Sequence, residues 1–131
     1  MPIDIEIDHE RRIVYATGHG TLDENDVAGF LKAAWRRDHA ELTGFDALID
    51  LTRVESIAYE SAEQMQRLAS LAADTDTQHA EGRIAIVAAS EMTFGLSRMY
   101  QSYRQVDDRS SRTLTVVRTR ELALDWLANE D

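Results

Sequence analysis

Residues 47–64 read ALIDLTRVESIAYESAEQ, and this stretch holds a buried strand followed by the start of a helix. Residues 47–49 are apolar without alternation, which is typical of a central strand covered on both faces. Asp50 stands at the end of that run. Residues 61–64 have the capping-box pattern, in which a serine and a glutamine side chain satisfy free amides of the first helical turn. The stretch therefore predicts a β–α unit of an α/β protein.

The residues before this unit predict a hairpin and a first helix. Residues 3–8 alternate isoleucine with acidic residues, and residues 13–17 form a second β-branched and aromatic run. Two such strands joined by a short polar turn are expected to pair as a hairpin. Residues 18–20, Gly-His-Gly, are expected to end the second strand. Residues 21–24 then form a capping box, with Thr21 as the cap, before apolar residues at helical spacing.

The residues after the unit repeat the alternation of strand and helix. An apolar helical face follows Ser61, residues 83–88 read as a buried strand, and residues 92–105 as a helix. Residues 114–117 form a last strand, and Thr119 can cap a final helix. The order β-β-α-β-α-β-α-β-α predicts an α/β fold with a mostly parallel, five-stranded mixed sheet and helices packed on it.

The composition bounds the class of protein. At 131 residues, the chain suits one domain, 1–131, with a core of its own. The absence of cysteine excludes disulfides and thiol chemistry. The first residues do not resemble a signal peptide, and no apolar run is long enough to span a bilayer. We therefore expect a cytoplasmic protein without an integral membrane segment.

The net charge of the chain is large, and the charged residues are distributed unevenly along the sequence. The net charge of −10 disfavours binding to nucleic acid or to an anionic membrane. Residues 83–131, in contrast, carry equal numbers of acids and bases, and arginines are frequent between residues 98 and 120. We favour solvated pairing of these arginines with the acidic part of the chain. Binding of one anionic group is the alternative.

Residues 92–105, MTFGLSRMYQSYRQ, are rich in methionine and aromatic residues. On a helical wheel five of them cluster within about 100 degrees, which predicts a core-facing side. Phe94 falls on the opposite side with Arg98. Either the helix begins at or after Phe94, which then folds inward, or Phe94 is exposed beside Arg98 as an anchor for a partner. The five clustered residues are Met92, Leu96, Met99, Tyr100 and Tyr103.

Catalytic motifs are absent from the sequence. It contains no nucleophile elbow, phosphate loop or dinucleotide fingerprint, and no two histidines share metal-ligand spacing. We therefore expect no metal, no cofactor and no enzymatic activity. His19 and Asp50 are predicted near the carboxyl ends of strands, where α/β proteins bind ligands. An enzyme using this pair is the remaining alternative, and it requires the two side chains to converge.

The chain resembles the STAS family of anti-sigma-factor antagonist domains, and more closely the small SpoIIAA-like bacterial proteins of unknown function. The resemblance covers nearly the whole chain. It rests on the opening hairpin, residues 20–22 before the first helix, residues 49–57, and residues 94–100. It implies a STAS-like fold and a regulatory module that acts by binding a partner.

In the family, the antagonists bind a partner kinase and are switched by phosphorylation of a serine that follows an aspartate. Residues 57–61 read IAYES here, so the Asp-Ser pair is missing. Ser61 is the nearest serine, and we expect it to act as a helix cap. A phosphate there would be tolerated at a helix N-terminus but repelled by neighbouring glutamates.

We accordingly expect a non-catalytic regulatory or protein-interaction module, which binds a protein partner or a second copy of itself as a homodimer. The expected partner surface is Tyr59, Glu60, Ser61, Phe94 and Arg98.

The alternative is a carrier of a lipid or another small molecule, with an apolar tail against the methionine and tyrosine face and an anionic head near Arg98 and Arg104. The expected ligand-binding residues are His19, Asp50, Met99, Tyr100 and Tyr103.

Overall fold

The computed structural model describes residues 3–34, 44–58, 61–78, 82–106 and 113–129. Within these ranges five strands form one sheet, and the element order is the one that the sequence predicts. The elements are β1 (Ile3–Asp8), β2 (Ile13–Leu22), α1 (Glu24–Ala34), β3 (Asp46–Ile57), α2 (Ala62–Gln78), β4 (Arg83–Val87), α3 (Glu91–Gln105), β5 (Thr113–Val117) and α4 (Arg120–Ala128).

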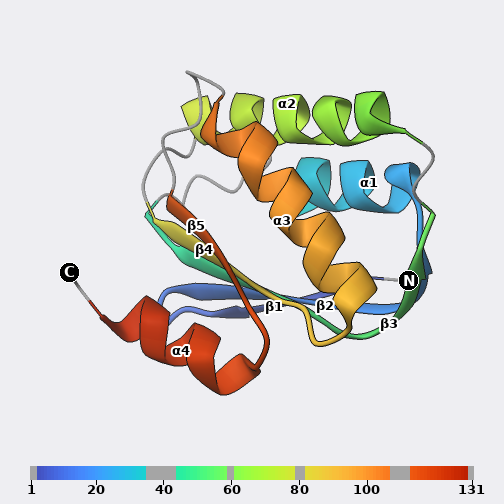
Figure 1. The fold of residues 1–131 in the computed structure, drawn as a ribbon. Coiled ribbons are helices and arrows are strands. Elements are labelled where there is room, and N and C mark those ends of the chain that lie inside the picture. Colours follow the sequence, from blue (N-terminus) through green and yellow to red (C-terminus); the bar gives the residue numbers. More distant parts are fainter. Residues whose placement is uncertain (1–2, 35–43, 59–60, 79–81, 107–112, 130–131) are drawn as a thin grey trace.

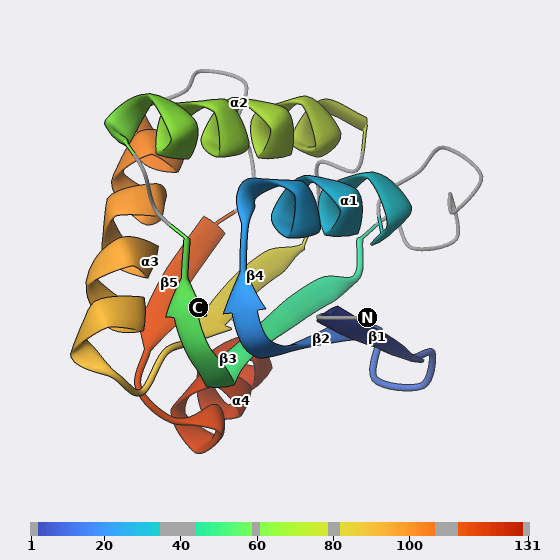
Figure 2. The same ribbon diagram turned by 90° about the vertical axis from the view of Figure 1, so that its right-hand side faces the viewer.

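The strands lie in the order β1-β2-β3-β4-β5. Strands β1 and β2 pair antiparallel, and every later pair is parallel, so the predicted mixed sheet is confirmed. Right-handed crossovers between strands that advance in one direction place the successive helices on one face. Figure 1 shows α1, α2 and α3 above the sheet, and Figure 2 shows α4 on the opposite side.

Each face of the sheet has its own apolar core. The larger core lies under α1, α2 and α3 and includes Val14, Phe30 and Ile86. The smaller core lies under α4 and includes Leu48, Val87 and Leu127. The middle strands are therefore covered on both faces, as the unalternating run at residues 47–49 predicts.

Two strands are longer than expected. Residues 18–20 do not end β2, which continues to Leu22, and β3 continues past Asp50 to Ile57. Beyond Asp50, β3 pairs only with β2, so the two strands form a ribbon outside the main sheet. The ribbon contains two register irregularities, and Gly20 has a φ of 65°. Bulges of this kind bend strands, and Figure 1 shows the ribbon rising from the sheet toward α1 and α2.

The helix caps agree with the sequence at α2 and α4 and differ at α1. Ser61 accepts a hydrogen bond from the Gln64 amide, and Thr119 accepts one from the Leu122 amide. At α1 the predicted cap, Thr21, is wrong: Thr21 remains in β2. Its place is taken by Asp23 and Asp26, which each accept the amide hydrogen of the other. Because the ribbon extends to Leu22, the helix can begin only after it.

The predicted core face of α3 is only partly correct: Tyr100 packs against the larger core and Leu96 lies on the same inner side, but the helix is rotated relative to the prediction. The residues of this helix that are buried are Thr93, Ser97 and Arg104, whereas Met92 is 43% exposed. The other four residues of the predicted face are only partly buried. Polar contacts explain the rotation: the Thr93 hydroxyl bonds Ser90, and the Gln101 side chain donates to the Leu114 carbonyl of β5.

No helix within the described ranges combines the length and the apolar composition that crossing a bilayer requires.

Substitutions at two glycines test how closely the chain packs around them. A Cβ on Gly18 would lie 2.9 Å from Val54 Cγ2, inside the bent ribbon, whereas one on Gly95 of α3 would meet nothing within 4 Å. We expect Gly18→Ala to lower the free energy of unfolding by about 1–3 kcal/mol through overpacking. We expect Gly95→Ala, the matched control, to raise it by up to about 1 kcal/mol through helix propensity. Urea unfolding measures both, and equal effects of the two substitutions would contradict the close approach at Gly18.

Candidate functional site

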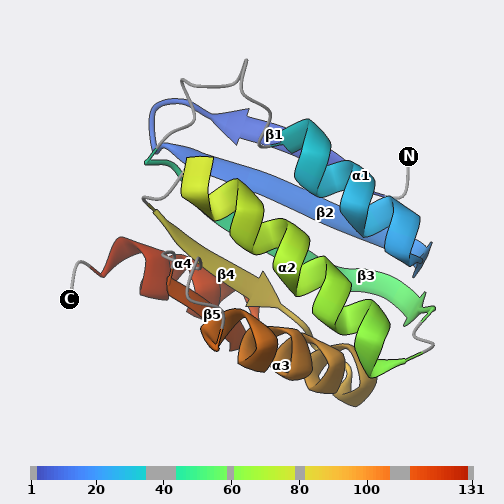
Figure 3. The same cartoon turned by 90° about the horizontal axis from the view of Figure 1, so that it is seen from above.

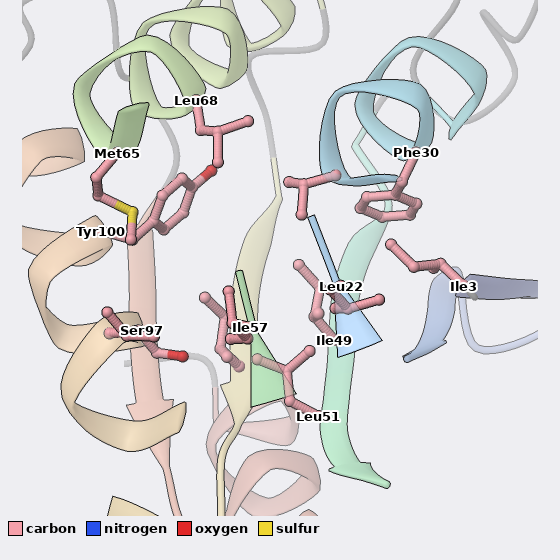
Figure 4. Close-up of a pocket in the computed structure, with 13 residues that line it drawn as sticks. Ile3, Leu22, Phe30, Ile49, Leu51, Ile57, Met65, Leu68, Ser97 and Tyr100 are labelled. Atoms are coloured by element: carbon pink, nitrogen blue, oxygen red, sulfur yellow. The ribbon is translucent and has the colours of Figure 1, made fainter. Parts of the chain in front are cut away.

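An apolar pocket of about 120 Å³ lies between the sheet and helices α1, α2 and α3. Figure 4 shows its walls, with α2 and α1 above, α3 to one side and the strands below. None of the described side chains that line it is charged. The lining residues are Ile3, Leu22, Val27, Phe30, Ile49, Leu51, Ile57, Met65, Leu68, Ile86, Leu96, Ser97 and Tyr100.

The bent ribbon of β2 and β3 creates one wall of this pocket. Leu22 and Ile57 face each other in register at the far end of the ribbon, and the Ala58 amide donates to the Leu22 carbonyl over 2.7 Å. Because the ribbon rises toward the helices, these side chains and Leu51 close the space that α1 and α2 leave above the sheet. A sheet that ended at Asp50 would have no such wall.

Helix α3 supplies the opposite wall with Leu96, Ser97 and Tyr100. The Tyr100 hydroxyl accepts a hydrogen bond of 2.9 Å from Arg104 Nη1, and the guanidinium carbon of Arg104 lies 5.6 Å from the centre of the tyrosine ring. Arg104 is only 3% exposed. A buried charged donor that contacts both ring and hydroxyl fixes the tyrosine against the pocket.

The expected ligand residues of α3 are thus only partly brought together. Tyr100 lines the pocket, whereas Met99 and Tyr103 are partly buried outside its lining. Met92 is exposed. Ser97 and the lining residues of β1, β2 and α1 were not predicted, because they belong to elements far apart in sequence. A serine next to Leu96 in a helix does not by itself indicate a binding site.

Asp50 lies on the other face of the sheet, under α4, and is 8% exposed. Its Oδ1 accepts hydrogen bonds from the Thr52 amide and hydroxyl, and its Oδ2 accepts one of 3.2 Å from Arg120 Nη1. Burial by itself raises the pKa of Asp50, but the bonds from Thr52 and Arg120 outweigh it and hold the pKa below its ordinary value. Asp50 thus bonds a backbone amide two residues further along its own strand.

Arg120 connects Asp50 to the start of α4. Its guanidinium carbon also lies 5.1 Å from the centre of the Tyr15 ring on β2. One side chain in the first turn of α4 thus contacts both β2 and β3, which holds the helix in register with the sheet.

His19 is not joined to Asp50 by any shared hydrogen-bond partner among the described residues. Its Nε2 lies 2.8 Å from Asp4 Oδ2 on the edge strand β1, and across β2 and β3 it is opposite Arg53. Asp50 is instead opposite Thr17 and bonds Thr52 and Arg120. The histidine–aspartate unit that an enzyme would require is therefore not assembled by these contacts.

Three of the five residues of the expected partner surface are described: Ser61, Phe94 and Arg98. Figure 1 shows that α2 and α3 begin toward the same end, with the start of α2 in the outer layer and the start of α3 nearer the sheet. Ser61 and Arg98 are exposed. Tyr59 and Glu60, which belong to the same expectation, lie outside the described residues.

Phe94 agrees with neither alternative drawn from the sequence. The helix α3 begins at Glu91, with Ser90 as its cap, so Phe94 is in its first turn. The ring is partly buried against the larger core, and the guanidinium carbon of Arg118 lies 4.1 Å from its centre. The aromatic–cation pair is thus formed with Arg118 of the loop after β5, not with Arg98.

No protein-family model and no curated protein matches the sequence. Solved structures do match. An uncharacterised protein of the DUF3478 family with a SpoIIAA-like fold, from Shewanella loihica, superposes with a TM-score of 0.56 at 20% identity, over 95% of this chain and 91% of that chain. The anti-sigma factor antagonist SpoIIAA in its unphosphorylated form superposes with a TM-score of 0.53 at 16% identity, over 97% and 98% of the two chains.

A third similar structure is an anti-sigma-factor antagonist (STAS) domain protein from Planctomyces limnophilus, with a TM-score of 0.54 at 18% identity over 97% of this chain and 98% of that chain. At identities this low, the superpositions establish a shared fold and nothing further. The chain therefore has the SpoIIAA-like fold, along nearly its whole length, as the sequence resemblance implies.

The contacts of Asp50 predict a pH dependence of stability. Because its pKa is lower in the folded chain than the ordinary 3.8, its stabilising contribution is complete above that value and is lost as the pH falls through the folded value. We expect Asp50→Asn to lower the free energy of unfolding at pH 7 by about 1–3 kcal/mol. The difference from the parent protein should shrink below pH 3.8. Urea unfolding at both pH values measures this.

Asp4→Asn is the matched control. It removes the exposed partner of His19, and exposed pairs contribute little. A loss of stability at pH 7 equal to that of Asp50→Asn would contradict the role of Asp50.

Proposed function

We propose that this protein is a non-catalytic regulatory module that binds a protein partner through the first turns of α2 and α3. The observation that carries the proposal is that both helices begin toward one end of a SpoIIAA-like fold. Ser61, just before α2, and Arg98, in the second turn of α3, are exposed. Two solved structures of the same fold are described as anti-sigma-factor antagonists, and such proteins act by contacting another protein.

The surface combines an exposed cation with an aromatic side chain. Arg98 forms no side-chain hydrogen bond, ion pair or ring contact with another described residue, and its side chain is exposed. Phe94 is held at the same helix start by Arg118. Arginine and aromatic side chains are the commonest anchors of protein interfaces. The hydroxyl of Ser61 bonds the Gln64 amide and serves as a helix cap, so phosphorylation is not part of the proposal.

The proposal is tested by combining Phe94→Ala with Arg98→Glu. We expect the double variant to lose the partner that crosslinking and mass spectrometry identify with the parent protein, because anchor residues commonly contribute more than about 2 kcal/mol each. The matched control is Arg53→Glu, which reverses an exposed charge on β3. Circular dichroism verifies the fold of both variants. Retention of the partner by the double variant, or its loss from the control as well, would contradict the surface.

The proposed surface also suits a second copy of this chain as the partner, which would make the protein a homodimer. The sheet edge at β1 carries Asp4, Glu6 and Asp8, and charge on an edge strand opposes pairing between copies. Pairing through the β1 edge is therefore disfavoured, and we propose the helix starts as the surface of a homodimer. Sedimentation of the parent protein and of the double variant distinguishes a dimer formed there from one formed elsewhere.

A second candidate function is the binding of a small apolar molecule in the pocket under the helices. The specific observation is a cavity of about 120 Å³ whose described lining residues include no charged side chain. An engineered cavity of about 150 Å³ binds benzene, whereas sites for larger ligands begin near roughly 300 Å³. The pocket therefore favours a compact, uncharged ligand over the long lipid with an anionic head that the sequence suggested.

Toluene is a suitable probe of this function. At ten times its dissociation constant, a ligand that binds only the folded chain stabilises it by about 1.4 kcal/mol, which raises the unfolding midpoint by about 3–6 °C. We expect that rise with toluene and none with palmitate. Val27→Phe, which enlarges a lining residue, should abolish the effect. Val106→Phe, at a position 78% exposed, should retain it. No rise with toluene, or an equal rise in both variants, would contradict a binding pocket.

A further inference from the structure

Ser97 is a buried hydroxyl that faces the pocket. It is 5% exposed and lies in α3 between Leu96 and Arg98. Figure 4 shows its oxygen directed away from α3 into the space above the strands. Within the described part of the chain, its hydroxyl has no hydrogen-bond partner. The oxygen is not sealed inside the protein either, because no fully buried side-chain oxygen or nitrogen in the described part lacks a partner.

The neighbouring hydroxyls of α3 differ from Ser97 in this respect. The Thr93 hydroxyl lies 2.8 Å from the hydroxyl of Ser90, and Ser102 donates to the Arg98 carbonyl of its own helix. Leaving a buried polar group without a partner is unfavourable. The Ser97 hydroxyl therefore lacks a bonding partner among the described residues, and its oxygen keeps exposed surface beside an apolar pocket, where a bound molecule can reach it.

Water is a poor occupant for this position. An ordered buried water generally requires two to four polar partners. Among the described lining residues only Ser97 and Tyr100 carry polar side chains, and Figure 4 shows the Tyr100 oxygen beside Leu68, on a different side of the pocket from the Ser97 oxygen. The Tyr100 oxygen also already accepts a hydrogen bond from Arg104.

We propose that the pocket binds a small uncharged molecule with a compact apolar body and one hydrogen-bonding group, which pairs with Ser97 Oγ. This inference rests on the second candidate function, the apolar pocket, and adds the chemical class of its ligand. None of the described lining residues is charged, so a carboxylate or ammonium group bound among them would be desolvated without a partner, which disfavours such a ligand. A phenol or a short alcohol fits the description, with Ser97 as the residue that positions it.

The test compares phenol with toluene, which have similar shapes and differ by a hydroxyl in place of a methyl group. Dissociation constants for both are measured by calorimetry with the parent protein, Ser97→Ala and Ser102→Ala. One neutral hydrogen bond changes a binding constant by about fivefold. We expect the ratio of the toluene to the phenol dissociation constant to fall about fivefold in Ser97→Ala and to be unchanged in Ser102→Ala.

Toluene binding to Ser97→Ala should be unchanged, because the substitution removes a hydroxyl that toluene does not use. The unfolding midpoint of this variant should not fall, since alanine is the better helix former and no intramolecular bond is lost. A ratio that is the same in all three proteins would overturn the role of Ser97 while leaving the pocket as a binding site. Failure of both compounds to bind would overturn the second candidate function and this inference together.

Discussion

The structure depends on the single direction in which the strands advance. From β2 to β5, each parallel strand is added on the same side of the one before it, and right-handed crossovers then place α1, α2 and α3 on one face. Only α4, which follows the last strand, is left to cover the other face. Three helices therefore cover one face of the sheet, and a single helix covers part of the opposite face.

The two faces differ in chemistry because of this arrangement. Under the three helices the contacts are apolar, and the bent ribbon of β2 and β3 leaves a pocket between the helices and the strands. Under α4 a polar cluster of Asp50, Thr52 and Arg120 lies beside the smaller core and fixes the start of the helix. A compact apolar ligand thus suits the first face, whereas the polar contacts of the second stabilise the fold.

Helix α3 connects the two proposed functions. Its first turn carries Phe94 at the end of the molecule where a partner is proposed to bind, and its next turn carries Ser97 in the pocket wall. Arg98, adjacent to Ser97 in sequence, is exposed. Any movement of this helix would alter both the surface and the pocket, so occupancy of the pocket and binding of a partner would be energetically linked.

The sequence by itself determined the order of the elements, the parallel pairing and the helix caps at Ser61 and Thr119, because these follow from local periodicity and from hydroxyls next to free amides. The rotation of α3 depended on contacts that helical periodicity does not report: a bond between Thr93 and the cap residue Ser90, and a long-range bond from Gln101 to the Leu114 carbonyl of β5. The extension of β2 and β3 was likewise decided by pairing between distant residues, since neither strand alone signals where its partner stops. The pocket depends on both the rotation of α3 and the extension of β2 and β3. No local sequence pattern could have predicted Ser97 as part of it.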